Sequence, residues 1–405
     1  MSRQRQYGLL KVMKEQAINS SPLLTLLAGI TVTTVLGSIH AFSVFLQPLE
    51  SQLQAGRAEI SLIYSGALIC LTISVLLGHR IYPMVSAPLL ALITCVVAAI
   101  GIIIAGQSQT FWAMVLGYSV IFGSANGVGY GFALQISAQA MPRNRGVAMG
   151  TVTAFYAFGA TIAPYIFNYG LTHGGVAVAM TTSGFIFLIA GLIAWALLHR
   201  AGACFKREIT SESSTISTNI NIQLLLWLGY GSGALAGLMV IGHATGIVVS
   251  AGGSAALAIG GAMVIALGNM LGGLAAGVLS DRIRISTLLI LQPLMSVLVL
   301  MVSVASSNAF VLLISLVLVG FSYGSIIAVY PVAVIKIFGE VSSSQIYGRV
   351  FTAWGLAGLA GPWLAGLLYD VTGDYTLALL VAAASSTLSV MAAYLISRQM
   401  RDILF

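Results

Sequence analysis

Twelve apolar segments, most of them about 20 residues long, make up nearly all of this chain of 405 residues. A helix of that length crosses roughly 30 Å of hydrocarbon, and backbone groups inside lipid must find hydrogen-bond partners within their own helix. Only 7% of the residues are charged and the mean hydropathy is +1.01, values that exclude a water-soluble domain. We therefore expect an all-α membrane protein with twelve transmembrane helices.

The longest polar run, residues 199–223, lies between the sixth and the seventh apolar segment. It predicts an N-terminal six-helix half at 1–198, a linker at 199–223 and a C-terminal six-helix half at 224–405. Two six-helix repeats around a central cavity are a plan that transporters use. The expected spans are 22–47, 58–78, 84–106, 111–140, 146–170, 176–198, 224–250, 255–279, 287–305, 309–338, 350–371 and 377–396.

The basic residues are distributed asymmetrically between the loops. With a cytoplasmic N-terminus, sixteen of the seventeen Lys and Arg residues lie on the cytoplasmic side, and only Arg57 lies outside. Membrane proteins carry such an excess in their cytoplasmic loops. We therefore expect a multi-pass protein of the cell inner membrane, with both termini and the 199–223 linker in the cytoplasm. Basic residues dispersed in short loops also argue against nucleic-acid binding.

A weak internal repeat relates the two halves. His40 and Ala41 recur 203 residues later as His243 and Ala244, and Gly117 recurs as Gly320. The two histidines are also the only ionisable side chains, apart from Tyr and Cys, well inside the expected spans. A buried imidazole either satisfies a structural role or contacts the substrate and carries protons near neutral pH, and the sequence leaves both interpretations open.

Four motifs rich in glycine and aromatic residues fall in the fourth, fifth, tenth and eleventh segments. Their residues are Gly123, Gly127, Gly129, Tyr130 and Gly131; Arg145, Gly146 and Gly150; Tyr323 and Gly324; and Phe351, Thr352, Ala353, Trp354, Gly355, Gly358, Gly361, Pro362, Ala365 and Gly366. With these motifs the chain resembles the major facilitator superfamily, and within it the oxalate/formate antiporters and related monocarboxylate carriers. The resemblance covers the whole membrane domain.

The resemblance implies a helix bundle that rocks about a central cavity. It also implies that a cage of aromatic side chains surrounds a small carboxylate, and it assigns Tyr130, Tyr156, Tyr323 and Trp354 to that cage. The expected substrate-binding residues are these four together with His40, His243 and Asn269.

Two positions depart from the pattern of the family. In the eighth segment Asn269 is followed by Gly272 and by Gly273, where the relatives carry an arginine, and Trp354 stands where the oxalate-transporting branch carries a lysine. Both fixed cations are therefore absent. A dicarboxylate would leave two buried negative charges uncompensated, so these departures argue against a dicarboxylate substrate.

A short charged turn follows the eighth segment. Ser280-Asp281-Arg282 resembles the superfamily's acidic and basic loop between the eighth and ninth spans, and the resemblance implies that Asp281 and Arg282 hold the inner gate. We add Arg145, at the start of the fifth span, to the expected gating residues. The alternative is that these charges only enforce membrane topology.

Nothing in the sequence supports catalysis or a cofactor. We find no Walker loop, no paired CxxC or HExxH metal-ligand spacing and no nucleophile elbow, so we expect neither an enzyme nor a bound metal. We expect a monomeric carrier that moves a small organic solute, first a monocarboxylate, across the bilayer by exchange or proton-linked transport. A carrier or exporter of neutral or amphipathic compounds is the alternative, and a transporter-like sensor without flux is a third.

Overall fold

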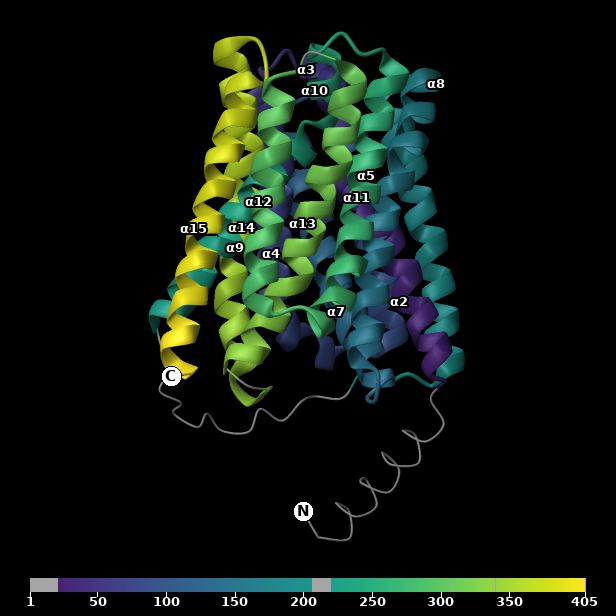
Figure 1. Cartoon of the computed structure of the whole chain (residues 1–405). Helices are drawn as coiled ribbons and strands as arrows, with labels where there is room; N and C mark the ends of the chain where they lie inside the picture. The colour runs from purple at the N-terminus through teal and green to yellow at the C-terminus, as the bar shows by residue number, and fades with distance from the viewer. Residues whose placement is uncertain (1–20, 206–219, 307, 339, 405) are drawn as a thin grey trace.

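The computed structural model describes residues 21–205, 220–306, 308–338 and 340–404, and every regular element among them is a helix. Eleven of these helical stretches are long and apolar enough to cross a membrane. One of the eleven, Gly146–Ala201, has 56 residues and would be about 84 Å long if it were straight, more than twice the thickness of the hydrocarbon core. It therefore counts as two spans, and the expected twelve transmembrane helices are confirmed (Figure 1).

The first six spans form what we call the first half, residues 21–201. They are built from α2 (Pro22–Leu36), η1 (Gly37–Phe45), α3 (Leu46–Leu53), α4 (Arg57–Ile81), η2 (Tyr82–Met84), α5 (Ala87–Gln107), α6 (Phe111–Met114), η3 (Val115–Phe122), α7 (Gly123–Ala140) and α8 (Arg145–Ala201). The fifth and sixth spans meet inside α8, where Gly174 is extended and Gly175 has φ 72° and ψ −161°. Only glycine adopts that conformation readily, so Gly175 permits the reversal between the two spans.

The last six spans form the second half, residues 220–404. They are built from α9 (Ile220–Gly242), α10 (Ala244–Ser250), α11 (Ala255–Arg282), α12 (Ile285–Val304), α13 (Ala309–Phe338), α14 (Glu340–Thr372) and α15 (Thr376–Leu404). Residues 206–219 of the expected linker lie outside the described residues, and the division into two halves stays a prediction.

The first and seventh spans both change their helical geometry at a histidine. In the first span α2 ends at Leu36 and a 3₁₀ stretch, η1, carries His40 before α3 resumes the α-helix. In the seventh span α9 ends at Gly242, His243 has non-helical dihedrals, and α10 begins at Ala244. A long 3₁₀ stretch inside a span is typical of strained or functional segments.

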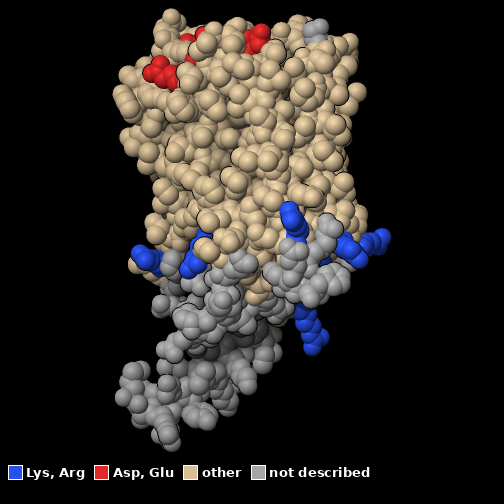
Figure 2. Space-filling model, turned by 60° about the vertical axis from the view of Figure 1, so that its left-hand side comes forward, with Lys and Arg blue, Asp and Glu red and all other residues tan. Residues whose placement is uncertain are grey.

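The charged side chains divide the bundle into two ends. On the face that Figure 2 shows, Lys and Arg side chains lie at one end and Asp and Glu side chains lie at the opposite end. We call the end that carries Glu50, Glu59, Asp370 and Asp374 the acidic end and the opposite end the basic end. Ser21 donates its backbone N–H to the carbonyl of Ala201 (3.2 Å), so the first span begins beside the end of the sixth.

The two halves pack against one another through α4 with α14 and through α8 with α11. Glycines of α14 allow the close approach, because a Cβ at Gly366 would press on the Arg57 carbonyl and one at Gly358 would press on Leu68. Nearer the basic end, three glycines of α8, α11 and α14 face open space. A Cβ at Gly150, Gly277 or Gly348 would meet no atom within 4 Å.

Candidate functional site

His40 lies on η1 between two tyrosine rings of the first half. Its Nδ1 is 2.7 Å from the hydroxyl oxygen of Tyr64 on α4, and its ring meets Tyr156 of α8 edge-on, with a centroid distance of 5.5 Å. The His40 side chain is half-buried, whereas Tyr64 is fully buried. The 3₁₀ stretch therefore turns an imidazole toward the side chains of two other spans.

The hydrogen bonds determine which nitrogen of a neutral His40 carries the proton. Among the described residues the His40 ring is the one acceptor within reach of the buried Tyr64 hydroxyl. A buried O–H without an acceptor is costly, so Tyr64 donates to Nδ1. The imidazole proton is then on Nε2, which has no partner among the described residues and is free to donate.

Asn126 on α7 connects three spans. Its Nδ2 donates to the carbonyl of Leu36 at the end of α2 (2.6 Å), and its Oδ1 accepts from the hydroxyl of Tyr156 on α8 (2.9 Å). Tyr156 also packs on Tyr130 with a centroid distance of 4.7 Å, and the Tyr130 hydroxyl is 3.4 Å from Thr153 Oγ1. The fully buried Asn126 amide thus fixes Tyr156 beside His40.

The second half contributes Tyr323 of α13 and Trp354 of α14. Trp354 Nε1 donates to the Tyr323 hydroxyl oxygen at 2.8 Å, and the indole stacks on Phe351 at 5.4 Å. An indole N–H can only donate, so the Tyr323 oxygen accepts this hydrogen bond and its own O–H is not used in it. That O–H has no acceptor among the described residues. Tyr323 therefore presents a free donor.

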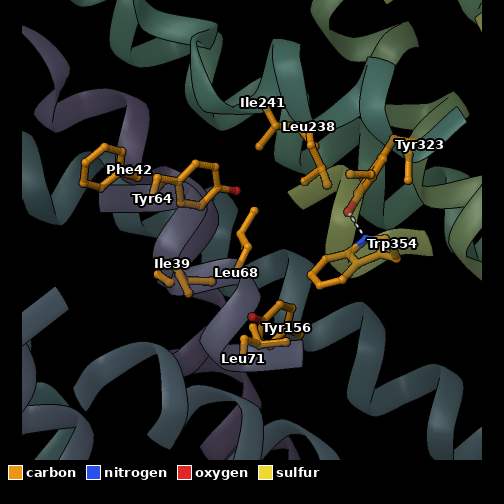
Figure 3. Close-up of a cluster of buried hydrophobic side chains, with 14 of the residues drawn as sticks. Ile39, Phe42, Tyr64, Leu68, Leu71, Tyr156, Leu238, Ile241, Tyr323 and Trp354 are labelled. Carbon is orange, nitrogen blue, oxygen red and sulfur yellow. Dashed lines mark hydrogen bonds between the residues drawn. The ribbon is translucent and has the colours of Figure 1, made fainter. Parts of the chain in front are cut away.

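Figure 3 shows the two sets facing one another across the middle of the bundle. The hydroxyls of Tyr64 and Tyr323 point inward from opposite sides, and Trp354 and Tyr156 lie below them. We call His40, Tyr64, Tyr130, Tyr156, Tyr323 and Trp354 the aromatic cluster. Aliphatic side chains of α4 and α9 fill the space around it, namely Leu68, Leu71, Leu238 and Ile241.

The aromatic cluster holds no fixed charge. None of its six members is an acid or a permanent cation, and among the described residues no group of three His, Cys, Asp or Glu side chains could hold a metal ion. Such a cluster can offer hydrogen bonds from His40 Nε2 and Tyr323 Oη, together with aromatic surface. It is suited to a small solute with a carbonyl or carboxylate group.

The hydrogen bonds of His243 go to residues outside the aromatic cluster. It is fully buried, its Nε2 is 2.8 Å from the Pro362 carbonyl and 3.2 Å from Ser61 Oγ, and its Nδ1 is 2.9 Å from the hydroxyl of Tyr375. A carbonyl only accepts, so Nε2 carries the proton and Nδ1 accepts from Tyr375. Burial raises the pKa of the Tyr375 phenol above its usual range, which keeps that donor protonated. Both nitrogens are satisfied, which favours the structural interpretation of this histidine.

Asn269 and Gly273 lie on α11 beside α13. A Cβ at Gly324 would overlap the Asn269 carbonyl and meet its Oδ1 at 2.6 Å, so Asn269 packs at the contact of the two helices. Within the described ranges, no hydrogen bond joins the Asn269 side chain to the aromatic cluster. A Cβ at Gly273 would meet only the Gly324 carbonyl oxygen, at 3.6 Å, so this position has room for a side chain.

The expected gating residues all lie toward the basic end. Arg282 is exposed at the last turn of α11, and Arg145 is the first residue of α8. The side chains of Arg145 and Asp281 are not among those that the structure describes. Their gating role stays a prediction.

The expected site residues leave out four residues that the structure singles out. Tyr64 belongs to the aromatic cluster, Asn126 holds Tyr156 in that cluster, and Arg57 with Asp370 joins the two halves at the acidic end. A buried Asn between glycines in 123–131 was a usable signal, because an amide inside a membrane span needs partners. Asp370 gave no such signal, since an acid near the end of a span also suits an interfacial anchor.

Comparisons with known proteins agree with this fold. No protein-family model matches the chain. The chain is 23% identical over 346 residues to the uncharacterized MFS-type transporter YhjX of Escherichia coli, covering 83% of this chain and 85% of that protein. It is 24% identical over 292 residues to the oxalate:formate antiporter of Oxalobacter formigenes, covering 69% of each.

Solved structures of similar architecture extend the agreement. The nucleoside transporter NupG superposes with a TM-score of 0.71 at 14% identity, covering 93% of this chain and 98% of NupG. A bacterial homolog of the human lysosomal transporter Spinster, in an inward-facing and unoccupied conformation, gives a TM-score of 0.70 at 14% identity, covering 93% of this chain and 97% of that one. At this identity the likeness concerns the fold alone.

Proposed function

This chain is a membrane transporter of the major facilitator superfamily, and from that premise we propose that it carries a small monocarboxylate by alternating access. One observation carries the proposal. The aromatic cluster presents two neutral hydrogen-bond donors, His40 Nε2 from the first half and Tyr323 Oη from the second, and no member of the cluster is a fixed cation. Two such donors suit the two oxygens of one carboxylate.

The charge of the cluster favours a monoanion over a dianion. A second carboxylate would be desolvated without a positive partner, which costs several kcal/mol. The distant similarity to the oxalate:formate antiporter supports carboxylates as the substrate class, and Gly273 and Trp354 argue for the singly charged members of that class. The cluster binds its acid through hydrogen bonds and aromatic contacts.

The test is competition against a labelled monocarboxylate in proteoliposomes that contain the purified protein. Short monocarboxylates are expected to compete, and dicarboxylates of similar length are expected to compete at least tenfold less well, a difference of about 1.4 kcal/mol. The variant Gly273→Arg adds a cation where the Cβ has room, so it should improve dicarboxylate competition. Tight dicarboxylate binding by the wild type would contradict the proposal.

A second candidate is a carrier of neutral or amphipathic compounds. The aliphatic side chains that surround the aromatic cluster favour it, because Leu68, Leu71, Leu238 and Ile241 offer only apolar contacts. Neutral solutes that compete better than any monocarboxylate would support this candidate. Binding of either class without measurable flux would instead support a sensor.

We further propose that the basic end faces the cytoplasm, as the excess of Lys and Arg there favours. Cys204 is exposed after the sixth span, whereas Cys95 is buried and Cys70 is half-buried. An impermeant thiol reagent added to intact cells should leave the wild type unlabelled and should label Ser51→Cys, an exposed position at the acidic end. Labelling of Cys204 in intact cells would reverse the orientation.

A further inference from the structure

The backbone of the first span accepts hydrogen bonds from three side chains of other spans, in and just before η1. The donors belong to α7, η3 and α10, and all three are buried. The donors and their acceptor carbonyls are Asn126 Nδ2 on Leu36 (2.6 Å), the Tyr118 hydroxyl on Ile39 (3.4 Å) and the Thr245 hydroxyl on Ser43. Other spans therefore hold the 3₁₀ stretch at its start, near its middle and toward its end.

A 3₁₀ stretch of nine residues needs such support. Its hydrogen bonds have poorer geometry than those of an α-helix, and runs longer than about three or four residues are uncommon. The register changes within the span, because the Gly37 N–H donates to the Thr33 carbonyl four residues back, whereas the Leu46 N–H donates to the Ser43 carbonyl three residues back. A side chain that bonds a helix carbonyl competes with the N–H that an α-helix would place there. The three side chains therefore favour the 3₁₀ register over the α register.

The register determines which side chain of the first span faces the aromatic cluster. An α-helix turns by about 100° and rises by about 1.5 Å per residue, whereas a 3₁₀ helix turns by about 120° and rises by about 2.0 Å. Counted from Leu36, the α register would turn His40 away by about 80°. It would bring Ala41 to within about 20° and about 0.5 Å of the place that His40 has in η1. In the structure His40 is half-buried and Ala41 is fully buried, which agrees with the 3₁₀ register.

We propose that Asn126, Tyr118 and Thr245 are positioning residues that keep His40, and not Ala41, in the substrate site by holding η1 in the 3₁₀ register. The inference rests on the proposed function, in which His40 Nε2 is one of two donors to the carboxylate. Ala41 has no side-chain donor. A chain in the α register therefore loses one of the two hydrogen bonds to the substrate.

Thr245 connects the register to the transport cycle. Asn126 and Tyr118 belong to the first half, as η1 does, so a rigid movement of the two halves leaves their bonds intact. Thr245 belongs to the second half, and its bond to the Ser43 carbonyl breaks when the first and seventh spans separate. Such a movement loosens the register at one end of η1 and weakens the bond between His40 and the substrate.

The test follows the register without any substrate. In a background without Cys70, Cys95 and Cys204, a small thiol reagent labels either His40→Cys or Ala41→Cys in the purified protein. A thiol that faces the central space reacts faster than one that packs against a neighbouring helix. The parent protein should therefore label position 40 faster than position 41, and the ratio of the two rates reports the register.

Three variants remove the donors one at a time. Asn126→Leu should lower the ratio about tenfold or more, because a buried carbonyl loses its side-chain donor and the α register becomes competitive. Tyr118→Phe and Thr245→Val remove only a hydroxyl and should lower the ratio in the same direction. The matched control is Ser137→Ala, which removes a fully buried hydroxyl of α7 that has no partner, and it should keep the ratio of the parent.

Equal labelling of positions 40 and 41 in the parent overturns the proposal. An unchanged ratio in both Tyr118→Phe and Thr245→Val does the same, even if Asn126→Leu fails to fold. A fall in Ser137→Ala as large as that in the donor variants also overturns it, since any change in packing would then move the ratio. Because the labelling contains no substrate, a lowered ratio confirms the register even where competition in proteoliposomes rejects the monocarboxylate.

Discussion

Gly159→Ala is expected to destabilise the folded protein by about 1–3 kcal/mol or more, because two backbones meet at this glycine. A Cβ at Gly159 of α8 would overlap the carbonyl of Thr34 in α2, and a Cβ at Gly37 would overlap the carbonyl of Tyr156. The two glycines thus let the backbones of the first and fifth spans touch at two points, the carbonyls of Thr34 and Tyr156. Neither carbonyl can rotate away as a side chain can, so the spans must separate.

The matched control is Gly150→Ala in the same helix. A Cβ there meets nothing within 4 Å, so the substitution gains the helix propensity of alanine without a clash. Thermal unfolding in detergent is the measurement, with the midpoint of Gly159→Ala well below the wild type and that of Gly150→Ala equal to it or higher. Equal midpoints for the two variants would show that the first and fifth spans do not pack at Gly159.

Much of this fold could be predicted from the sequence because a bilayer restricts which backbone structures can cross it. Length and hydropathy locate the spans, since any long apolar run must be a helix. The ends of the helices were predicted less well. The helix α14 begins at Glu340, before the expected start at 350, and α15 continues to Leu404, beyond the expected end at 396. Helices continue beyond the hydrocarbon, where hydropathy no longer marks them.

The breaks at the two histidines could not be predicted in the same way. A 3₁₀ stretch and an α-helix bury the same apolar residues, and both satisfy their backbone groups locally. The difference at η1 depends on contacts from other spans, such as the Asn126 amide on the Leu36 carbonyl. The proposed repeat pairs His40 with His243 in sequence. Their partners differ, because His40 contacts Tyr64 whereas His243 contacts Pro362 and Tyr375.

The contact between Arg57 and Asp370 shows a second limit of sequence reasoning. Arg57 and Asp370 are 313 residues apart, and each is near the end of a span, where a charge usually only meets the interface. Pairing them requires knowing that α4 lies against α14, which is a property of the bundle as a whole. A local pattern places each residue near the end of a span but cannot join the two.

Tyr323→Phe and His40→Leu are expected to have the largest effects on transport, because each removes one of the two free donors of the aromatic cluster. A hydrogen bond to a charged group contributes about 1.5–3 kcal/mol, so each substitution should weaken binding of the monocarboxylate about 10- to 100-fold. Phenylalanine at 323 also leaves the Trp354 indole N–H without its acceptor. The measurement is the concentration dependence of uptake by proteoliposomes, together with direct binding to the purified protein.

The control for both variants is Tyr165→Phe on α8, which removes a hydroxyl from a side chain that is 66% exposed on the outer surface of the bundle. Its uptake should equal that of the wild type. If the two donors hold the oxygens of one carboxylate, the double variant should lose less than the sum of the single losses, because a substrate that has lost one donor is no longer held against the other. Full additivity would indicate that His40 and Tyr323 contact separate parts of the substrate. Unchanged binding in both single variants would remove the aromatic cluster from the substrate site.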